Sequence, residues 1–499
     1  MFKKVLIANR GEIAIRIIRT CREMGIETVT VHSEVDRTSL HVRYAREAYC
    51  IGPPPSQQSY LNMDAILEVA RRTGAEAIHP GYGFLSENAE FARRCQEAGI
   101  TFIGPPAEAM QRMGSKTSAR RLAVEAGVPI VPGTVDDLSD DDVRKAALEF
   151  GLPVVIKAAS GGGGKGMRVV EREADLASAI RMVRSEARSS FGDSTIYVER
   201  YLPTPRHVEI QIMADSRGTV LYLGERECTV QRRHQKVIEE APSPVVDPPL
   251  RRRMGEAAVA LARAAGYVNA GTVEFLMDND RSFYFLEMNT RLQVEHPVTE
   301  LVTGLDMVKK QILIAAGEPL PYTQDEITLT GAAIECRIYA EDPFRNFIPS
   351  PGRIETLREP GGVGIRLDSG VYEGYDIPLY YDPLIAKLVT WGRDRAEAIA
   401  RMRRALAEYT VIGIQTTIPF HQQVMDDPDF LRGEIDTTFI DRRFTRAPLG
   451  HDGGFQEVAV IAAAIHLHRR GGRPLVPIGR EPASTWKAAG RRAQLRLRR

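Results

Sequence analysis

The sequence predicts a multi-domain protein of mixed α/β and α+β class. A Rossmann-like parallel-sheet domain comes first, a small lid domain next and an antiparallel-sheet domain last. The chain has 499 residues, which is too long for a single ordinary core. Over the first hundred residues, short β-branched runs alternate with amphipathic segments. Farther along, strand-like runs follow one another with few helices between them.

The first domain, residues 1–114, is expected to hold the parallel sheet. Strands are predicted at Lys4–Ala8, Thr28–His32 and Thr101–Ile103, where β-branched residues gather. Helices are predicted at Ile13–Met24 and Asp64–Arg72. Parallel strands need crossover connections of this kind, which is why the alternation indicates a parallel sheet.

The second domain, residues 115–203, is expected to be a small lid with a connecting helix. A strand at Val154–Lys157 leads into the glycine run Ser160–Gly166, and a second strand follows at Met167–Val170. A helical segment spans Ala174–Arg188. The pattern predicts a small unit inserted between two larger ones.

The third domain, residues 204–447, is expected to be built on an antiparallel sheet. Four strands are predicted, at His207–Met213, Val220–Leu223, Thr272–Met277 and Ser282–Met288. One helix, Leu250–Ala265, separates them. This arrangement is typical of an α+β domain.

The last residues, 448–499, are predicted to form a basic tail. Ten lysines and arginines but one glutamate lie between His468 and Arg499. We expect this segment to be flexible and solvated. A docking segment for another subunit is the alternative, with Val458–Leu467 as its helical part.

The composition disfavours several classes of protein. Lys and Arg total 66 against 65 Asp and Glu, so no nucleic-acid partner is indicated. Five scattered cysteines without C-x-x-C spacing argue against disulfides and zinc. No apolar run is long enough for a signal peptide or a membrane span. We therefore expect a soluble cytoplasmic protein.

The glycine run contains four consecutive glycines followed by Lys165. Glycines allow positive φ and bring backbone N–H groups close to an anion, as in loops that hold phosphates. A flexible hairpin tip is the alternative. The run does not match the P-loop pattern, and Gly81–Ser86 does not match the dinucleotide pattern G-x-G-x-x-G. A P-loop nucleotidase and a nicotinamide enzyme are therefore disfavoured.

An acidic hairpin is predicted over residues 271–291. If its turn is centred between Asp280 and Arg281, Glu274 and Glu287 are cross-strand neighbours about 5 Å apart on one face. Because side chains alternate along a strand, Asn289, Phe283 and Phe285 would lie on that same face. The two phenylalanines would make it apolar. A divalent cation with oxygen ligands would neutralise the two carboxylates. Nearby arginines are the alternative.

Two charged stretches flank this hairpin. Arg232, His234 and Lys236 would share a face if they lay in one strand, and would form a cationic row suited to phosphate and bicarbonate. Glu295 near Arg291 would stay ionised and could take a proton from bicarbonate. A solvated strand and an ordinary salt bridge are the alternatives.

Together these residues resemble the biotin carboxylases of the ATP-grasp superfamily, from Phe2 to about Phe444. The resemblance also rests on three other runs: Ile7–Ala14, His79–Asn88 and Arg337–Pro343. It implies an ATP-grasp fold and an enzyme that carboxylates biotin. Bicarbonate would attack ATP to give carboxyphosphate, which then supplies CO₂ to biotin.

The resemblance implies a role for each matching residue. ATP would be bound by Lys116, Lys157, Gly163, Gly164, Glu199, Arg200, Tyr201, Leu202, His207, Gln231 and His234. Two Mg²⁺ or Mn²⁺ ions would be bound by Glu274, Glu287 and Asn289. Bicarbonate would lie among Lys236, Arg291 and the backbone of Val294, with Glu295 as the base and Arg337 against the ureido oxygen of biotin.

The resemblance also implies separate partners. The sequence has no Met-Lys dipeptide, the usual biotinylation site, so biotin would lie on a biotin carboxyl carrier protein. A carboxyltransferase would complete the complex. A homodimer is implied, with contacts at Arg16, Arg19, Glu23 and Arg366.

The expected reaction is the first half-reaction of a multi-subunit acyl-CoA carboxylase, acetyl or propionyl. Lys165 is more similar to propionyl- and methylcrotonyl-type enzymes than to acetyl-CoA or pyruvate enzymes. The alternatives are a different ATP-grasp ligase, a non-catalytic scaffold, or one component of a pyruvate carboxylase.

Overall fold

The computed structural model describes residues 1–134, 138–159, 166–192, 194–444, 461–462 and 465. The chain divides into two compact units, Met1–Arg446 and Ala447–Arg499, and the elements below all belong to the first. The expected glycine loop and most of the basic tail lie outside the described residues. Within the described part, every helix is too short or too polar to cross a lipid bilayer.

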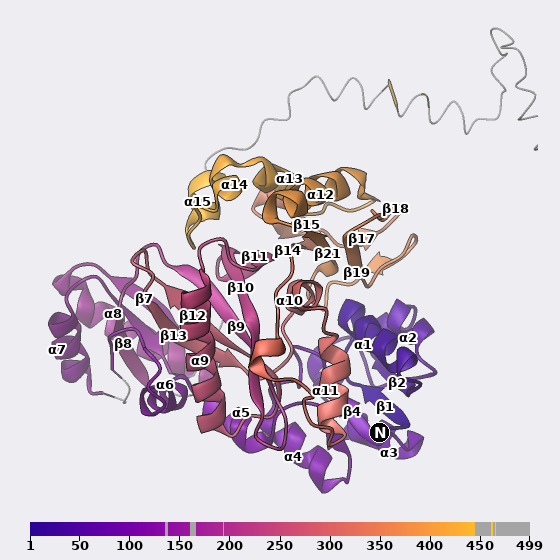
Figure 1. The fold of residues 1–499 in the computed structure, drawn as a ribbon, viewed down its shortest axis with the longest axis horizontal. Coiled ribbons are helices and arrows are strands. Elements are labelled where there is room, and N and C mark those ends of the chain that lie inside the picture. Colours follow the sequence, from indigo (N-terminus) through magenta and orange to yellow (C-terminus); the bar gives the residue numbers. More distant parts are fainter. Residues whose placement is uncertain (135–137, 160–165, 193, 445–460, 463–464, 466–499) are drawn as a thin grey trace, which may run out of the picture. The chain divides into compact units, whose positions relative to one another are not determined.

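The N-terminal region holds a five-stranded parallel sheet, as predicted (Figure 1). Its strands, in spatial order, are β3 (Glu47–Cys50), β2 (Glu27–His32), β1 (Lys4–Ile7), β4 (Ala77–His79) and β5 (Thr101–Phe102). Its helices are α1 (Gly11–Glu23), α2 (Leu40–Tyr44), α3 (Met63–Thr73) and α4 (Ala89–Glu97). The central strand β1 is buried on both faces, because Val5 and Ile7 enter one apolar cluster and Leu6 enters another.

A small three-stranded antiparallel sheet forms the second region. Its order is β7 (Met167–Val170), β6 (Val154–Ala158), β8 (Ile196–Arg200), and helices α7 (Asp140–Phe150) and α8 (Leu176–Phe191) cover it. Alternate residues of β6, Val154 and Ile156, pack against Val143 and Ile180 of these helices. Helices α5 (Ala107–Gly114) and α6 (Lys116–Glu125) precede this region.

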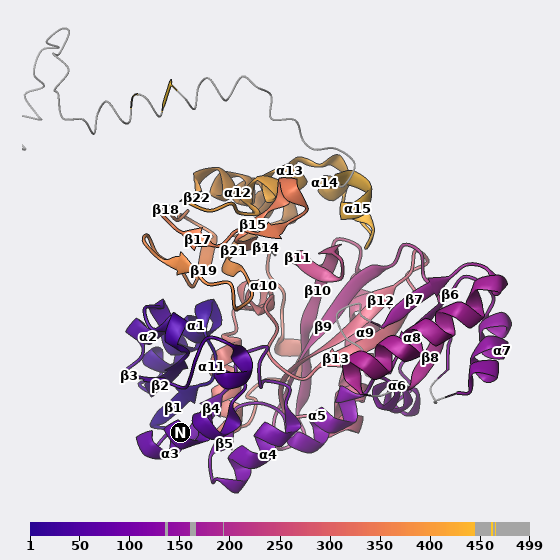
Figure 2. The ribbon, with the colours of Figure 1, turned by 180° about the vertical axis from the view of Figure 1, so that it is seen from behind.

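An eight-stranded sheet is the largest element, and all its pairings are antiparallel (Figure 2). Its order is β13 (Phe283–Asn289), β12 (Asn269–Met277), β9 (Arg206–Ala214), β10 (Val220–Arg232), β11 (Gln235–Ala241), β14 (Ala332–Tyr339), β21 (Leu384–Gly392), β19 (Ile365–Ser369). The four predicted strands are all present, although β10 continues nine residues beyond the predicted Leu223.

The remaining α-helices and strands that the structure describes in the first unit are seven helices and three short strand pairs. The helices are α9 (Pro248–Ala265), α10 (His296–Thr303), α11 (Met307–Ala315), α12 (Arg395–Glu408), α13 (Ile418–Asp426), α14 (Pro428–Arg432) and α15 (Phe439–Phe444). The strand pairs are β15 (Glu341–Asp342) with β16 (Ile348–Pro349), β17 (Gly352–Arg353) with β20 (Asp376–Ile377), and β18 (Thr356–Arg358) with β22 (Thr410–Ile412).

The two faces of the eight-stranded sheet have opposite character. On one face, Val208, Ile210 and Val273 pack against Leu250 and Met254 of α9 in an apolar cluster. The intervening residues of the same strands, which include Glu209, Gln211 and Glu274, are polar yet buried. Because side chains alternate along a strand, the apolar packing of one face forces these polar groups onto the other.

The predicted apolar setting for the two carboxylates is wrong. The turn is centred on Asp280, because Met277 pairs with Phe283, and Leu286 is an extra residue that restores the Glu274–Glu287 pairing. This bulge moves two aromatic residues to the opposite face, where both join the apolar cluster: Phe283 and Phe285. The paired carboxylates therefore lie on the polar face of the sheet.

The predicted cationic row is also wrong. Arg232 is the last residue of β10 and Lys236 belongs to β11. Between the two strands, Arg233 and His234 form a tight turn with positive φ. Arg232 bonds the backbone oxygen of Asn346 at 2.7 Å, away from Lys236. Arg232 and Lys236 are close in sequence but lie on different strands. Their charges are therefore not aligned as they would be on a single strand.

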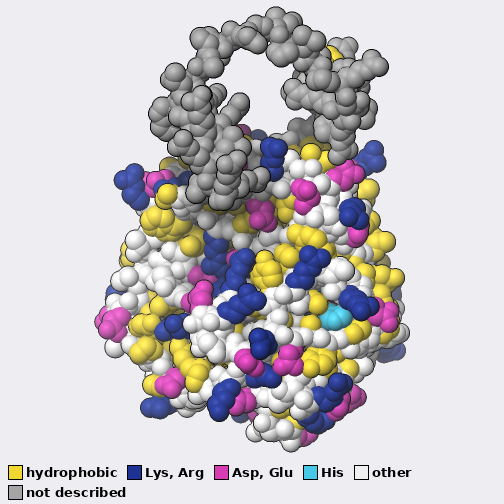
Figure 3. Space-filling model, turned by 90° about the vertical axis from the view of Figure 1, so that its right-hand side faces the viewer, with side chains coloured by type: hydrophobic (Ala, Val, Ile, Leu, Met, Phe, Trp, Pro, Cys, Tyr) yellow, Lys and Arg dark blue, Asp and Glu magenta, His cyan; other side chains and the backbone are white. Residues whose placement is uncertain are grey.

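Surface charge is mixed in sign, as the balanced composition predicts. On the face in Figure 3, basic, acidic and hydrophobic side chains are interspersed over the described residues.

A buried ion pair stabilises the N-terminal region. Asp36 is inaccessible to solvent and accepts two hydrogen bonds from Arg10, at 2.6 and 2.7 Å, and one from Tyr60. Burial alone would raise the pKa of Asp36, but the bonds from Arg10 outweigh burial and lower the pKa to about 2. The Arg10 guanidinium also stacks on the Tyr381 ring, which connects this region to the loop before β21.

We expect Asp36→Asn to lower the free energy of unfolding by about 3–5 kcal/mol at pH 7, because it leaves a buried guanidinium without its anion. A carboxylate with a depressed pKa stabilises the fold above pH 3.8 and loses that effect as the pH falls toward 2. Urea unfolding at several pH values should show the gap between wild type and variant narrowing over that range. Asp64→Asn, at an exposed pair with Arg94, is the control and should change stability by less than about 1 kcal/mol. An equal loss in both variants would contradict the prediction.

Candidate active site

Charged side chains from successive strands meet on the polar face of the eight-stranded sheet. Each neighbouring strand from β13 to β21 contributes at least one polar or charged group: Glu287, Glu274, His207 with Glu209, Gln231, Lys236, Arg337 and Lys387. Antiparallel pairing brings them together, as when Glu274 lies directly opposite both Glu209 and Glu287. The site is thus a row across the sheet, perpendicular to the strands.

Lys236 is at the centre of this row. Its ammonium nitrogen lies 2.5 Å from Glu209, 2.7 Å from Glu274 and 2.7 Å from Glu295. Burial alone would lower the pKa of Lys236, but the three carboxylates outweigh burial and hold it well above its usual value. Lys236 is therefore a permanent cation that joins two halves of the site.

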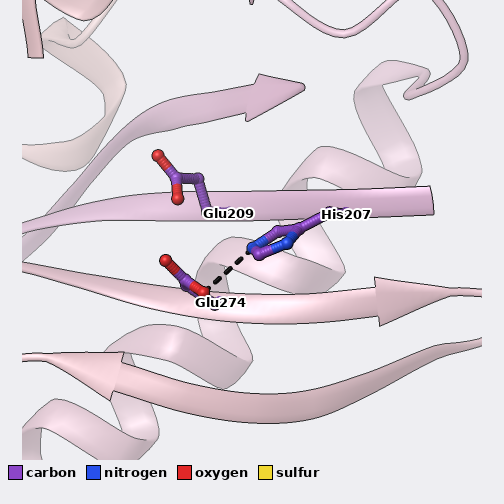
Figure 4. A group of neighbouring side chains, drawn as sticks. All are labelled: His207, Glu209 and Glu274. Carbon is purple, nitrogen blue, oxygen red and sulfur yellow. Dashed lines mark ion pairs between the residues drawn. The ribbon is translucent and has the colours of Figure 1, made fainter. Parts of the chain in front are cut away.

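His207 and Gln231 lie on the nucleotide side of the expected site. The His207 Nε2 atom is 3.0 Å from Glu274, and its Nδ1 atom is 2.6 Å from the Gln231 amide. Figure 4 shows the His207 ring turned toward Glu274, with Glu209 beside it on the same strand. One imidazole nitrogen of His207 and one carboxylate oxygen from each of Glu209 and Glu274 all lie within 4.8 Å of one another.

The two facing carboxylates have opposite pKa shifts. Burial, followed by repulsion from Glu274, raises the pKa of Glu287. The pKa of Glu274 is lowered, because Lys236 and His207 outweigh its burial. Asn289 donates to Glu274 at 2.8 Å and accepts a bond from Arg291 at 3.2 Å. Two converging carboxylates and an amide oxygen fit a hard divalent cation, which would relieve the repulsion at Glu287.

The two predicted phosphate-binding lysines lie near one another, and Lys116 faces the two carboxylates. Lys157 on β6 lies 2.5 Å from Glu199, whose other oxygen bonds the buried Arg120. Burial lowers the pKa of Lys116 at the start of α6, and repulsion from Lys157 adds to the shift while attraction from Glu287 opposes it. The structure therefore brings both predicted phosphate-binding lysines to one end of the row.

Other residues expected to contact the nucleotide are placed at the edge of this cluster. Arg200, Tyr201 and Leu202 end β8 and begin the connection to β9, and the N–H groups of Arg200 and Tyr201 bond the oxygens of Pro132 and Pro153. Burial, followed by repulsion from Lys157, lowers the pKa of His234 in its turn. Gly163 and Gly164 lie outside the described residues.

A pocket of about 450 Å³ opens at the other end of the row. Its walls come from the N-terminal region and from the C-terminal strands, and include Glu12, Tyr82, Arg291, Val294, Arg337 and Tyr381. Arg291 is held by Glu87 at 2.9 Å, and the Val294 oxygen accepts a bond from Lys387 at 2.9 Å. Pre-oriented cations on one wall suit a small anion or a polar ring.

Glu295 lies between the two halves of the site. One oxygen accepts from Lys236 at 2.7 Å and the other accepts from Arg337 at 2.9 Å. Although burial opposes ionisation, Lys236 and then Arg337 hold the pKa of Glu295 well below its usual value. Glu295 is therefore an anion at neutral pH, and the cations that it bonds are Lys236 and Arg337 instead of the Arg291 that the sequence suggested.

Sequence reasoning missed several contacts of the site. Glu209 could have been found, because His207, Glu209 and Gln211 alternate on one strand and so share a face. Glu87 bonds Arg291 from 204 residues away, and Lys387 reaches Val294 from 93 residues away. No local pattern predicts pairs of that separation.

Three family models match the chain in succession. The biotin carboxylase N-terminal domain matches residues 1–110, and the biotin carboxylase C-terminal domain matches residues 335–442. The ATP-binding domain of the carbamoyl-phosphate synthase L chain matches residues 115–323 between them.

Characterised relatives agree with these models. A pyruvate carboxylase component of Methanothermobacter thermautotrophicus is 56% identical over 442 residues, which cover 88% of this chain and 90% of that one. Biotin carboxylase 1 of Bacillus subtilis is 54% identical over 443 residues, covering 88% and 98%. The propionyl-CoA carboxylase alpha chain of Ruegeria pomeroyi is 50% identical over 493 residues, covering 93% and 72%.

A solved structure has the same fold. It is the biotin carboxylase domain dimer of Hydrogenobacter thermophilus 2-oxoglutarate carboxylase, in complex with MgADP, ADP and bicarbonate. The TM-score is 0.86 at 47% identity, and the match covers 90% of this chain and 99% of that one. The predicted fold class is confirmed.

We expect Glu287→Gln to weaken divalent-cation binding by about 10- to 100-fold, because it removes one of the two facing carboxylates. The measurement is the rise in unfolding temperature that Mn²⁺ causes in the presence of ADP, which reports binding by mass action. Glu434→Gln, at an exposed pair with Arg432, should behave as wild type. Turnover of Glu287→Gln should be lost at limiting Mg²⁺. An unchanged thermal shift with unchanged turnover would contradict a cation-binding role.

Proposed function

This chain belongs to the biotin carboxylase family, and from that premise we propose that it carboxylates biotin on a separate carrier protein. The reaction uses ATP and bicarbonate and is the first half-reaction of a multi-subunit acyl-CoA carboxylase. One observation supports it above the others. Glu295 joins Lys236, in the charged row, to Arg337, in the pocket wall. A reaction in two steps, at ATP and then at biotin, needs two such adjoining sites.

The charged row is the proposed nucleotide site. Lys116 and Lys157 would bind phosphate oxygens, and His207, Gln231 and His234 would contact the nucleotide. Glu274, Glu287 and Asn289 would hold Mg²⁺ or Mn²⁺, which offsets the charge that develops on the transferred phosphoryl group. Lys157 is paired with Glu199 and Lys236 with Glu274, so these cations are already oriented.

Bicarbonate is proposed to bind where the row meets the pocket. Arg291 and Lys236 would hold its oxygens, together with the backbone of Val294. Glu295 is ionised, and one of its oxygens lies 2.7 Å from Lys236. Because Lys236 would hold bicarbonate, the Glu295 oxygen nearest the bicarbonate can accept its proton. The deprotonated bicarbonate then attacks the γ-phosphorus of ATP, the bond from that phosphorus to the bridging oxygen breaks, and carboxyphosphate and ADP are formed.

Biotin is proposed to enter the pocket lined by Arg337. The bonds from Arg337 to Glu239 and Glu295 use Nε and Nη2. A guanidinium fixed in this way can stabilise negative charge on the ureido oxygen when biotin N1 loses its proton. Its burial excludes competing water, which strengthens the interaction. Carboxyphosphate decomposes to CO₂ and phosphate, the phosphate takes the N1 proton, and N1 then bonds to CO₂.

The acyl acceptor and partners are inferred from the extent of the similarity. The alignment with the propionyl-CoA carboxylase alpha chain spans 93% of this chain, against 88% for the other two relatives. That favours an acyl-CoA acceptor, with pyruvate as the alternative. The partners would be a biotin carboxyl carrier protein, a carboxyltransferase and a second copy of this chain. Consumption of ATP and five unpaired cysteines favour the cytoplasm.

We expect the purified chain to hydrolyse ATP in the presence of bicarbonate and to do so faster when free biotin is added. Arg337→Ala should reduce the biotin-dependent rate by about 10²–10³-fold, the effect of losing one preorganised donor. Arg393→Ala, an arginine with 84% of its side chain exposed, is the control. An ATPase rate that is indifferent to biotin would instead favour another ATP-grasp ligase.

We also expect a tagged chain purified from its own cells to retain a small biotinylated protein and a carboxyltransferase. Mass spectrometry identifies both, and the captured complex can be assayed with acetyl-CoA, propionyl-CoA and pyruvate. Carboxylation of pyruvate alone would reject the acyl-CoA assignment. Recovery of neither partner would count against a multi-subunit enzyme.

A further inference from the structure

Two buried glutamates lie behind Arg337, and neither contacts a substrate in the proposed reaction. Glu239 on β11 and Glu335 on β14 are direct cross-strand partners, and both are closed to solvent. Glu335 and Arg337 are two residues apart on one strand, so their side chains share a face. The glutamate pair therefore lies beside the arginine that lines the pocket.

Glu239 is bonded to Arg337 through a single oxygen. Its Oε1 atom accepts from Nε at 2.6 Å and lies 2.5 Å from Nη2. Glu295 holds the same Nη2 atom at 2.9 Å. Among the described residues, the buried Oε2 atom of Glu239 has no hydrogen-bond partner. One oxygen thus orients the guanidinium, and the other faces the interior of the protein.

Glu335 has no hydrogen-bond partner at either oxygen within the described chain, and both oxygens are buried. Apolar residues lie on one side of Glu335. They include Ala333 and Val389, which belong to a small hydrophobic cluster. The charged groups that face Glu335 are Glu239 on β11, Arg337 on β14, Lys387 on β21 and Glu295 before α10.

Lys387, one of the two cations that face Glu335, already has other partners. Lys387 donates to the Val294 oxygen at 2.9 Å and lies 3.3 Å from Glu12. A buried carboxylate without hydrogen bonds costs several kcal/mol, so the neutral acid is favoured at Glu335. Burial raises the pKa of Glu335 well above its usual value. Burial also raises the pKa of Glu239 to about 7, although Arg337 opposes the shift.

A protonated Glu335 can satisfy the unpartnered oxygen of Glu239. Cross-strand partners have Cβ atoms about 5 Å apart, within reach of two glutamate side chains. The Glu335 O–H group would donate to Glu239 Oε2, and Glu239 would keep its negative charge for Arg337. A single proton removes both the repulsion between the acids and the unmade hydrogen bond.

We propose that Glu335 stays protonated and donates a hydrogen bond from its O–H group to Glu239, and that this acid–carboxylate pair positions Arg337 for biotin. The inference rests on the proposed role of Arg337. Glu239 is a positioning residue, because it acts through Arg337 and does not line the pocket. Glu335 fixes the Glu239 carboxylate without adding a second negative charge beside Glu295.

Kinetics with free biotin test the positioning role. Glu239→Gln should lower kcat/KM for biotin by about 10- to 100-fold, the range for residues that orient a functional group from behind. Glu335→Leu, which has no donor, should lose a similar factor. Glu335→Gln should recover most of it, because the amide N–H can replace the acid O–H.

The matched control is Glu240→Gln. Glu240 is the next residue on β11, faces the other side of the sheet and bonds the Arg395 guanidinium at 2.6 Å. It is also buried and paired with an arginine, so its loss should reduce stability about as much as that of Glu239. Its kcat/KM for biotin should stay at the wild-type value, which separates positioning from a general loss of structure.

Infrared difference spectroscopy detects the proton itself. At neutral pH the wild type should show the C=O stretch of the protonated Glu335 carboxyl group, as a band that is lost in the difference spectrum against Glu335→Gln and retained in Glu240→Gln. A wild type without the band would overturn the shared proton, and wild-type kinetics in Glu335→Leu would overturn the positioning role. A wild type that shows the band but no biotin-dependent activity would reject the proposed function while supporting the proton pair.

Discussion

The structure depends on charge balance across the polar face of one antiparallel sheet. Lys236 contacts three carboxylates, and each of these also contacts another positive or polar group. Glu209 bonds Arg226, Glu274 lies beside His207, and Glu295 bonds Arg337. These charged groups lie in the protein interior. Removing one of them leaves its partners buried without a counter-charge, which destabilises the fold. The hydrogen bonds and ion pairs of this network hold the site residues in position.

An antiparallel sheet suits this task because it offers one position per strand at a fixed spacing. Strands about 4.8 Å apart carry successive groups of the site, so neighbours are close enough to bond but do not overlap. The apolar packing of the opposite face against α9 fixes the register, since a slip of one residue would bury the charges in the core. Stability and catalytic geometry thus have the same origin.

The pocket for the second substrate has a different origin. Its walls come from α1 and loops of the N-terminal region and from residues more than 200 positions later in the chain, held together by contacts such as Arg10 on Tyr381. Arg337 belongs to the sheet but opens into this pocket, and Glu295 connects the two environments. The boundary between regions is therefore where the proposed chemistry passes from one substrate to the other.

The sequence alone determined the order of the regions, nine of the 22 described strands, four of the 15 described α-helices, and the pairing of Glu274 with Glu287. These follow from local periodicity and turn residues, which act over short separations. It failed where one residue shifts the face, as at the Leu286 bulge, and where a turn interrupts a charged run, as at Arg233 and His234. Only the tertiary structure decided that Glu87, Lys387 and Glu239 hold Arg291, Val294 and Arg337. Contacts between residues far apart in the chain depend on how whole strands assemble, and a single sequence records no pattern for that.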